Sequence, residues 1–152
     1  MDEIVIRPAV SNECEALSAL CLRSKGWWGY DEVFLEACRA DLSVTQQEID
    51  GIFWVAELNG RLGGLVQVVR DGGEWSLGAL FVDPPFIGRK VGAALMLWAI
   101  NAAREHGARR LVIEADPAAV DFYRRFGAVD DGVVASSVLP GRFIPRLLLG
   151  VD

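Results

Sequence analysis

Metal-ligating residues are scarce in this sequence, which holds one histidine and three cysteines among 152 residues. Cys14, Cys21 and Cys38 do not fall at the short spacings that tetrahedral zinc sites use, so we expect no metal. An odd, sparse set of cysteines also offers no disulfide framework. The cysteine pattern therefore predicts a reduced, cytoplasmic protein.

Long apolar runs are also missing, although hydrophobic residues make up 52% of the chain. The longest, at 91–100, covers ten residues, whereas a membrane-spanning helix needs about 20. The acidic start, Met1-Asp2-Glu3, is unlike a signal peptide. We expect a single domain over residues 1–152 that does not act at a membrane.

Positive charge is in deficit, with a net charge of -6, which argues against general binding to nucleic acid or to anionic lipid. The deficit is uneven. Residues 1–83 contain 14 acidic and 6 basic residues, and residues 84–152 contain 7 and 9. An anionic ligand is therefore expected in the second half and a cationic one in the first, unless the pattern is chance scatter over a solvated surface.

Turn residues and hydrophobic periodicity predict a mixed α/β chain. Asn59-Gly60 and Asp71-Gly72-Gly73 are hairpin signals, which indicate a three-stranded antiparallel meander. The strand at 111–113 lacks polar alternation, as is typical of a parallel neighbour. The expected strands are 4–7, 51–58, 62–70, 74–82 and 111–113, with two more on either side of 140–141. Four helices are expected: one that is capped by Ser11 or Asn12, and three that cover 31–42, 91–106 and 116–126.

Two glycines and two cations occupy the loop at 87–93, between a predicted strand and a predicted helix. Gly88 and Gly92 let backbone N–H groups turn toward a ligand, and the helix N-terminus adds partial positive charge. Arg89 and Lys90 add two full charges. The loop could hold a pyrophosphate, although it is neither a P-loop nor a dinucleotide fingerprint. A plain turn is the alternative.

A second segment, 116–128, predicts a helix with aromatic residues close together. Phe122 and Phe126 share one face of it, and Tyr123 lies one step away. A single helical tyrosine of this kind is commonly a packing residue.

Taken together, the two segments and the order of elements resemble the GNAT acetyltransferase superfamily over about residues 4–149. The run 80–84 with Gly88-x-x-x-Gly92 is similar to the family's acetyl-CoA loop, and Phe122-Tyr123-x-x-x-Gly127 resembles its second motif. The segments 24–30 and 140–145 are similar to a bacterial subgroup of small GNAT proteins. Ile87, Lys90 and Asp116 stand where the family usually has Arg or Gln, glycine and Asn, respectively.

The resemblance implies a mixed sheet of six or seven strands with about four helices, in which the parallel fourth and fifth strands splay apart. Acetyl-CoA would lie in that gap, and a neutral amine would attack its thioester directly. The implied cofactor-binding residues are Leu80, Phe81, Val82, Ile87, Gly88, Arg89, Lys90, Val91, Gly92, Ala93, Asp116 and Phe122.

For catalysis, the resemblance implies that Tyr123 protonates the leaving thiolate as a general acid, because a phenol is un-ionised at neutral pH. The general base stays open between Glu114, Glu74, a water chain and an acceptor that arrives neutral. None of the cysteines lies in either motif, which disfavours a cysteine nucleophile.

Trp28 and Tyr30 belong to an aromatic cluster between the first two predicted helices, where the fold would border the acceptor pocket. Their rings would suit a cationic amine; the alternative is that the tryptophans only anchor the helices. The favoured function is acetyl-CoA-dependent N-acetylation of a small molecule's primary amine. The alternatives are a non-catalytic acyl-CoA-binding module and a small interaction domain. Exposed C-terminal strand edges would allow a homodimer.

Overall fold

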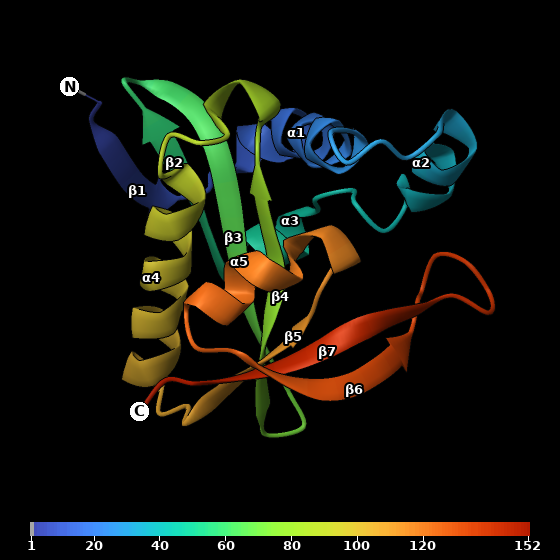
Figure 1. The fold of residues 1–152 in the computed structure, drawn as a ribbon. Helices are drawn as coiled ribbons and strands as arrows, with labels where there is room; N and C mark the ends of the chain where they lie inside the picture. Colours follow the sequence, from blue (N-terminus) through green and yellow to red (C-terminus); the bar gives the residue numbers. More distant parts are fainter. Residues whose placement is uncertain (1) are drawn as a thin grey trace.

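Seven strands form one mixed sheet in the computed structural model, which describes residues 2–152 (Figure 1). The strand order is β1-β2-β3-β4-β5-β7-β6, with β1 and β6 at the edges. The antiparallel meander predicted from the two turn signals is β2, β3 and β4. The strands are β1 Ile4–Pro8, β2 Ile52–Leu58, β3 Arg61–Asp71, β4 Glu74–Val82, β5 Arg110–Glu114, β6 Val129–Ala135 and β7 Phe143–Gly150.

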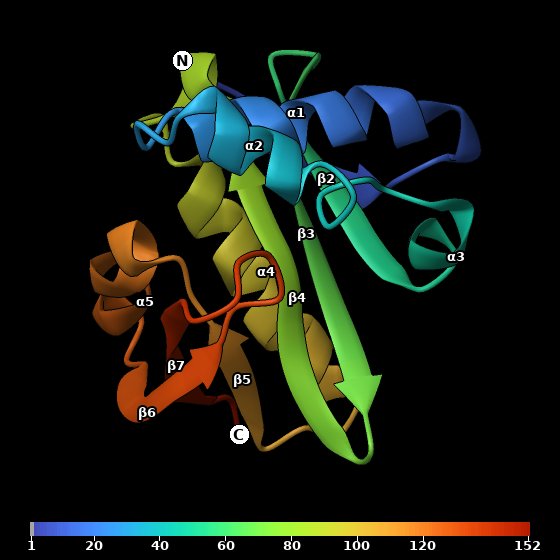
Figure 2. The ribbon, with the colours of Figure 1, turned by 90° about the vertical axis from the view of Figure 1, so that its right-hand side faces the viewer.

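Helices cover both faces of the sheet. Figure 2 shows α1 and α2 in front of it and α4 behind it. The helices are α1 Cys14–Gly26, α2 Glu32–Cys38, α3 Gln46–Ile49, α4 Val91–Glu105 and α5 Val120–Arg125, with short 3-10 turns at Ser11–Glu13, Pro84–Phe86 and Pro117–Ala119.

Several helix boundaries differ from the sequence prediction. The first helix begins at Cys14, since the residues after Val10 form a 3-10 turn. The helix expected at 31–42 ends at Cys38. The additional helix α3 starts from a capping box in which Thr45 accepts from the Glu48 N–H and Glu48 accepts from the Thr45 N–H. That pattern was visible in the sequence and was missed.

Each face of the sheet has its own apolar core. The face under α4 and α5 buries Leu95, Met96, Leu111 and Ile113 among others. The opposite face, under α1 and α3, buries a second set that comprises Leu17, Leu20, Phe53, Val55 and Leu65. Burying one such side chain contributes roughly 1.5–3 kcal/mol, so the two cores hold the sheet firmly between its helices.

The parallel strands β4 and β5 meet at one point only. Ser76 is paired with Val112, and no other pair joins the two strands, which confirms the splay that the family resemblance implied. A β-bulge lies just beyond this point, because Gln67 is paired with Ala79 while the next residue of β3 is paired with Leu77. Gly78 is therefore the extra residue. Such a bulge bends its strand, here where β4 leaves β5.

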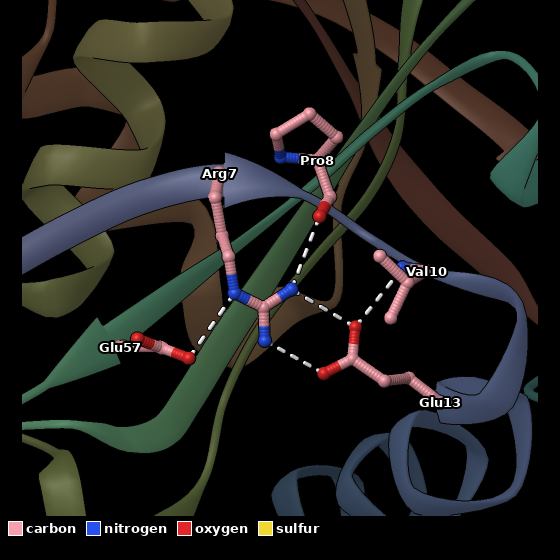
Figure 3. Close-up of polar contacts among 5 residues, drawn as sticks. All are labelled: Arg7, Pro8, Val10, Glu13 and Glu57. Atoms are coloured by element: carbon pink, nitrogen blue, oxygen red, sulfur yellow. Dashed lines mark hydrogen bonds and ion pairs between the residues drawn. The ribbon is translucent and has the colours of Figure 1, made fainter.

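Arg7 fastens the N-terminal strand to the start of the helical layer (Figure 3). Its guanidinium donates to Glu57 on β2 at 3.1 Å and to Glu13 at 2.7 and 3.0 Å, and a further bond reaches the Pro8 carbonyl. Glu13 also accepts from the Val10 N–H. These bonds fix the chain's entry into α1, whose far end borders the cavity described next.

Candidate active site

A cavity of about 640 Å³ opens where β4 and β5 part. This volume lies within the range of small-molecule sites. One wall is β4 from Leu77 to Val82 and the loop that follows, and another is the end of β5 with α5. The third wall joins the end of α1 to the loop between β6 and β7, and includes Ser24, Lys25, Trp28, Ser136, Val138 and Arg142.

The loop before α4 makes two left-handed turns and ends at a helix N-terminus. Gly88 has φ of 81° and Lys90 has φ of 70°, the left-handed conformation. Lys90 is the N-cap of α4 and provides no side-chain cap, so the first N–H groups of that helix are open to an anion. Because Lys90 carries a Cβ atom, its left-handed conformation is strained.

Asp83 holds the start of this loop in place through hydrogen bonds, a role that the sequence analysis missed. The Asp83 carboxylate is largely buried and accepts two bonds from Arg23 of α1, both at 3.0 Å. Its N–H donates to the Gly63 carbonyl, and its carbonyl accepts from the Phe86 N–H. The loop is thereby tied to both α1 and β3.

Two of the predicted cofactor-binding residues do not line the cavity. Arg89 is half exposed and forms an ion pair with Asp2 at 2.9 Å. Val91 is buried in the core beneath α4. The remaining predicted cofactor residues do line the cavity, and they are Leu80, Phe81, Val82, Ile87, Gly88, Lys90, Gly92, Ala93, Asp116 and Phe122.

Tyr123 projects from α5 and lines the same cavity. Its side chain is buried, and this burial raises the pKa of the phenol above its usual value of about 10. The ring of Phe122 meets it edge-on at 5.3 Å. The hydroxyl has no hydrogen-bond partner within residues 2–152, so it is free to donate to a bound molecule.

Of the two carboxylates considered as a general base, only Glu114 borders the cavity. It is the last residue of β5, two positions beyond the point where Ser76 meets Val112. Glu74 lies at the opposite end of β4 and pairs with Arg110 at 2.7 Å. That ion pair lowers the pKa of Glu74. Because Glu74 does not line the cavity, Glu114 is the better placed of the two carboxylates.

Asp116 connects the acceptor side of the cavity to α5. Its carboxylate accepts from Lys25 Nζ at 2.5 Å, from Tyr30 Oη at 2.8 Å and from the Ala118 N–H at 2.9 Å. Burial alone would raise the pKa of Asp116, but the bond from Lys25 leads the opposing effects and the net pKa is lowered. The Asp116 carboxylate thus links α1 to the 3-10 turn before α5, and its predicted contact with the cofactor stays a prediction.

Tyr30 does not line the main cavity, whereas Trp28 does. The Tyr30 ring stacks on Phe34 at 4.3 Å, and two cations of the protein lie against this pair. Lys25 is 5.1 Å from the Tyr30 ring and Arg142 is 4.8 Å from the Phe34 ring. The Tyr30 ring, which was expected to face a cationic acceptor, is thus already in contact with cations of the chain itself.

Within residues 2–152, no group of three or more His, Cys, Asp or Glu side chains is placed to hold a metal ion. The same part of the chain contains no helix long and apolar enough to cross a membrane.

Comparison with known families gives one match. The model of the Acetyltransferase (GNAT) family matches residues 21–128, a span that runs from α1 to the end of the Tyr123 motif. No curated protein matches the chain.

Solved structures share the fold at low sequence identity. PaiA N-acetyltransferase from Thermoplasma acidophilum, in complex with coenzyme A, has a TM-score of 0.82 at 17% identity over 97% of this chain and 99% of that one. The Escherichia coli ribosomal-protein-S18-alanine N-acetyltransferase has a TM-score of 0.73 at 16% identity, over 99% and 95%. YncA from Salmonella typhimurium, with its cofactor acetyl-CoA, has a TM-score of 0.71 at 19% identity, over 99% and 95%.

Proposed function

Because the chain belongs to the acetyltransferase (GNAT) family, we propose that it transfers the acetyl group of acetyl-CoA directly to the primary amine of a small molecule. One observation carries the proposal. The cavity at the β4–β5 splay brings Tyr123, Glu114 and the anion-binding loop at Gly88–Lys90 to one space. An acid, a base candidate and a phosphate site are the parts that direct acyl transfer from a CoA thioester needs.

Acetyl-CoA would bind along β4. Since β5 is paired with β4 only at Ser76, the backbone groups of Leu80 and Val82 that face β5 are open to a pantetheine arm, which would add to the sheet like a strand. N–H groups between Gly88 and Ala93 would hold the pyrophosphate. Lys90 lines the cavity beside them and adds a full positive charge. The coenzyme bound to PaiA and to YncA supports acetyl-CoA as the cofactor.

In the transfer, the acceptor's ammonium first gives a proton to Glu114, directly or through a water molecule. The neutral amine then attacks the thioester carbonyl, so that a C–N bond forms and the C–S bond breaks. Tyr123 donates its phenolic proton to the departing sulfur, and the second proton, which the attacking nitrogen loses as it becomes an amide, restores the phenol. A backbone N–H near Phe81 or Val82 would stabilise the developing oxyanion.

Burial has two consequences for Tyr123. A raised pKa keeps the phenol protonated throughout the neutral and mildly alkaline range, so Tyr123 has a proton to donate at these pH values. It also makes the phenol a weaker acid, but the thiolate would form in the same desolvated cavity, where its own proton affinity rises. Transfer between the two depends on the difference between their pKa values, which shared burial changes less than either one.

We place the reaction in the reducing cytoplasm, because Cys14, Cys21 and Cys38 are all free thiols. If the protein forms a homodimer, the edge strand β6 is where a second copy would add.

Calorimetric titration with acetyl-CoA, followed by assay of thiol release over a panel of primary amines, tests the proposed function. We expect micromolar binding that weakens in Lys90→Ala. Arg89→Ala is the matched control. Arg89 forms an ion pair with Asp2 and does not line the cavity, so its loss should change the affinity for acetyl-CoA little. Binding without thiol release from any amine would favour the non-catalytic acyl-CoA module, and no binding would overturn the proposal.

A further inference from the structure

Arg142 lines the cavity and brings it a positive charge that pairs with no acid among the described residues. Its contacts within residues 2–152 are a bond from Nη2 to Tyr30 Oη at 3.0 Å and stacking on the rings of Tyr30 and Phe34. Lys25, the other cation on this wall, is already paired with Asp116. Rings hold a guanidinium in place without cancelling its charge, and most of its five N–H donors remain available.

Glu114 is the complementary group. It lines the cavity at the end of β5, and its side chain forms no ion pair or hydrogen bond within residues 2–152. A second acid that lines the cavity, Asp41, has its carboxylate engaged by Ser137 Oγ at 2.6 Å, although a hydroxyl does not cancel its charge. The cavity therefore holds a guanidinium, that of Arg142, and a carboxylate without a side-chain partner in the described residues, that of Glu114.

We propose that the acceptor is an amino acid, whose carboxylate binds Arg142 and whose amine approaches Glu114. A guanidinium fork matches a carboxylate in geometry and charge, and a plain amine would leave Arg142 unused. The remaining wall includes Trp28, Leu42, Val138 and Ile144, which suits an apolar side chain. This inference rests on the proposed transferase function and names its substrate class.

Matched acceptor pairs test the inference. Thiol release would be measured with leucine against 3-methylbutylamine and with phenylalanine against phenethylamine, so that each pair differs only in the carboxylate. We expect kcat/KM to favour the amino acid by about tenfold or more. In Arg142→Gln, kcat/KM for the amino acid should fall by roughly ten- to a hundredfold, while that for the matched amine changes less than twofold.

Two variants separate binding from folding. Arg39→Gln removes an exposed cation from the end of α2 and should leave both acceptors unaffected. Arg142→Lys keeps the charge but loses the fork, and should recover part of the preference. Acetyl-CoA affinity and thermal stability, measured on each variant, show whether the fold is intact.

The inference is overturned if neither amino acid is acetylated, if the matched amines are used equally well, or if Arg142→Gln slows both members of a pair alike. The proposed function fails in a different way, by loss of acetyl-CoA binding in the unmodified protein. The two failures are therefore distinguishable.

Discussion

Lys25 at the end of α1 and Asp116 at the start of the α5 segment are 91 positions apart in the sequence, yet their charged atoms lie 2.5 Å apart. Both side chains are mostly shielded from solvent, with 15% and 13% exposed. Tyr30 bonds to the same Asp116 oxygen. This ion pair fixes the acceptor wall of the cavity relative to the helix that carries Tyr123.

Stability at acid pH should depend on Asp116. Its folded pKa is lowered from the ordinary value of 3.8, so its contribution is fully present above that value and is lost as the pH falls through the lowered pKa. Urea unfolding at pH 7 and between pH 4.5 and 3 should show Asp116→Asn less stable at neutral pH and less sensitive to acid. Asp121→Asn, at an exposed site, is the control. Parallel curves for Asp116→Asn and the unmodified protein would contradict this.

Tyr123→Phe should lower kcat by about a hundredfold or more, the usual cost of losing a general acid, and leave acetyl-CoA affinity unchanged. The hydroxyl has no hydrogen-bond partner in the part of the chain that the structure describes, so thermal stability should hold. Tyr30→Phe is the matched control, since it removes the hydroxyl that joins Asp116 and Arg142 and should raise the acceptor KM rather than lower kcat. Full turnover in Tyr123→Phe would rule out its role as acid.

Lys90→Gly should raise the free energy of unfolding by about 1 kcal/mol, because glycine adopts the left-handed conformation at φ of 70° without strain. Lys90→Ala retains the Cβ atom and should gain nothing. Both variants lose the ammonium and should bind acetyl-CoA more weakly. Equal stability of the two variants in chemical denaturation would show that the left-handed turn is not strained.

Gly64→Ala should destabilise the fold by about 1–3 kcal/mol. A Cβ atom there would lie 2.8 Å from the Phe81 carbonyl oxygen and 2.9 Å from Leu95 Cδ1, and the backbone oxygen cannot move without disturbing β4. At Gly78 a Cβ atom would meet Gln67 Oε1 at 2.8 Å, the end of a flexible side chain. Chemical denaturation should therefore rank Gly78→Ala well above Gly64→Ala in stability.

Local signals predicted the sheet well. The β4 bounds of 74–82 are confirmed to the residue, because a turn precedes the strand and Asp83-Pro84 ends it. The long helix expected at 91–106 is α4, which ends one residue earlier, at Glu105. Short helices were less predictable: α2 ends at Cys38, and the 116–126 segment divides into a 3-10 turn and α5. Helices this short have little stability of their own, so hydrophobic periodicity does not set their bounds.

Ten of the twelve cofactor-binding residues that the family resemblance implied do line the cavity, because the loop at 87–93 and the Tyr123 motif are contiguous stretches that a sequence motif can mark. The sequence did not predict which charges meet. Arg23 and Asp83 are 60 positions apart, and Tyr30 and Arg142 are 112 apart. Only tertiary packing determines such pairs, since one cation could reach many acids in an unfolded chain. Packing places Arg23, Lys25 and Glu74 in internal ion pairs, whereas Glu114 and Arg142 line the cavity.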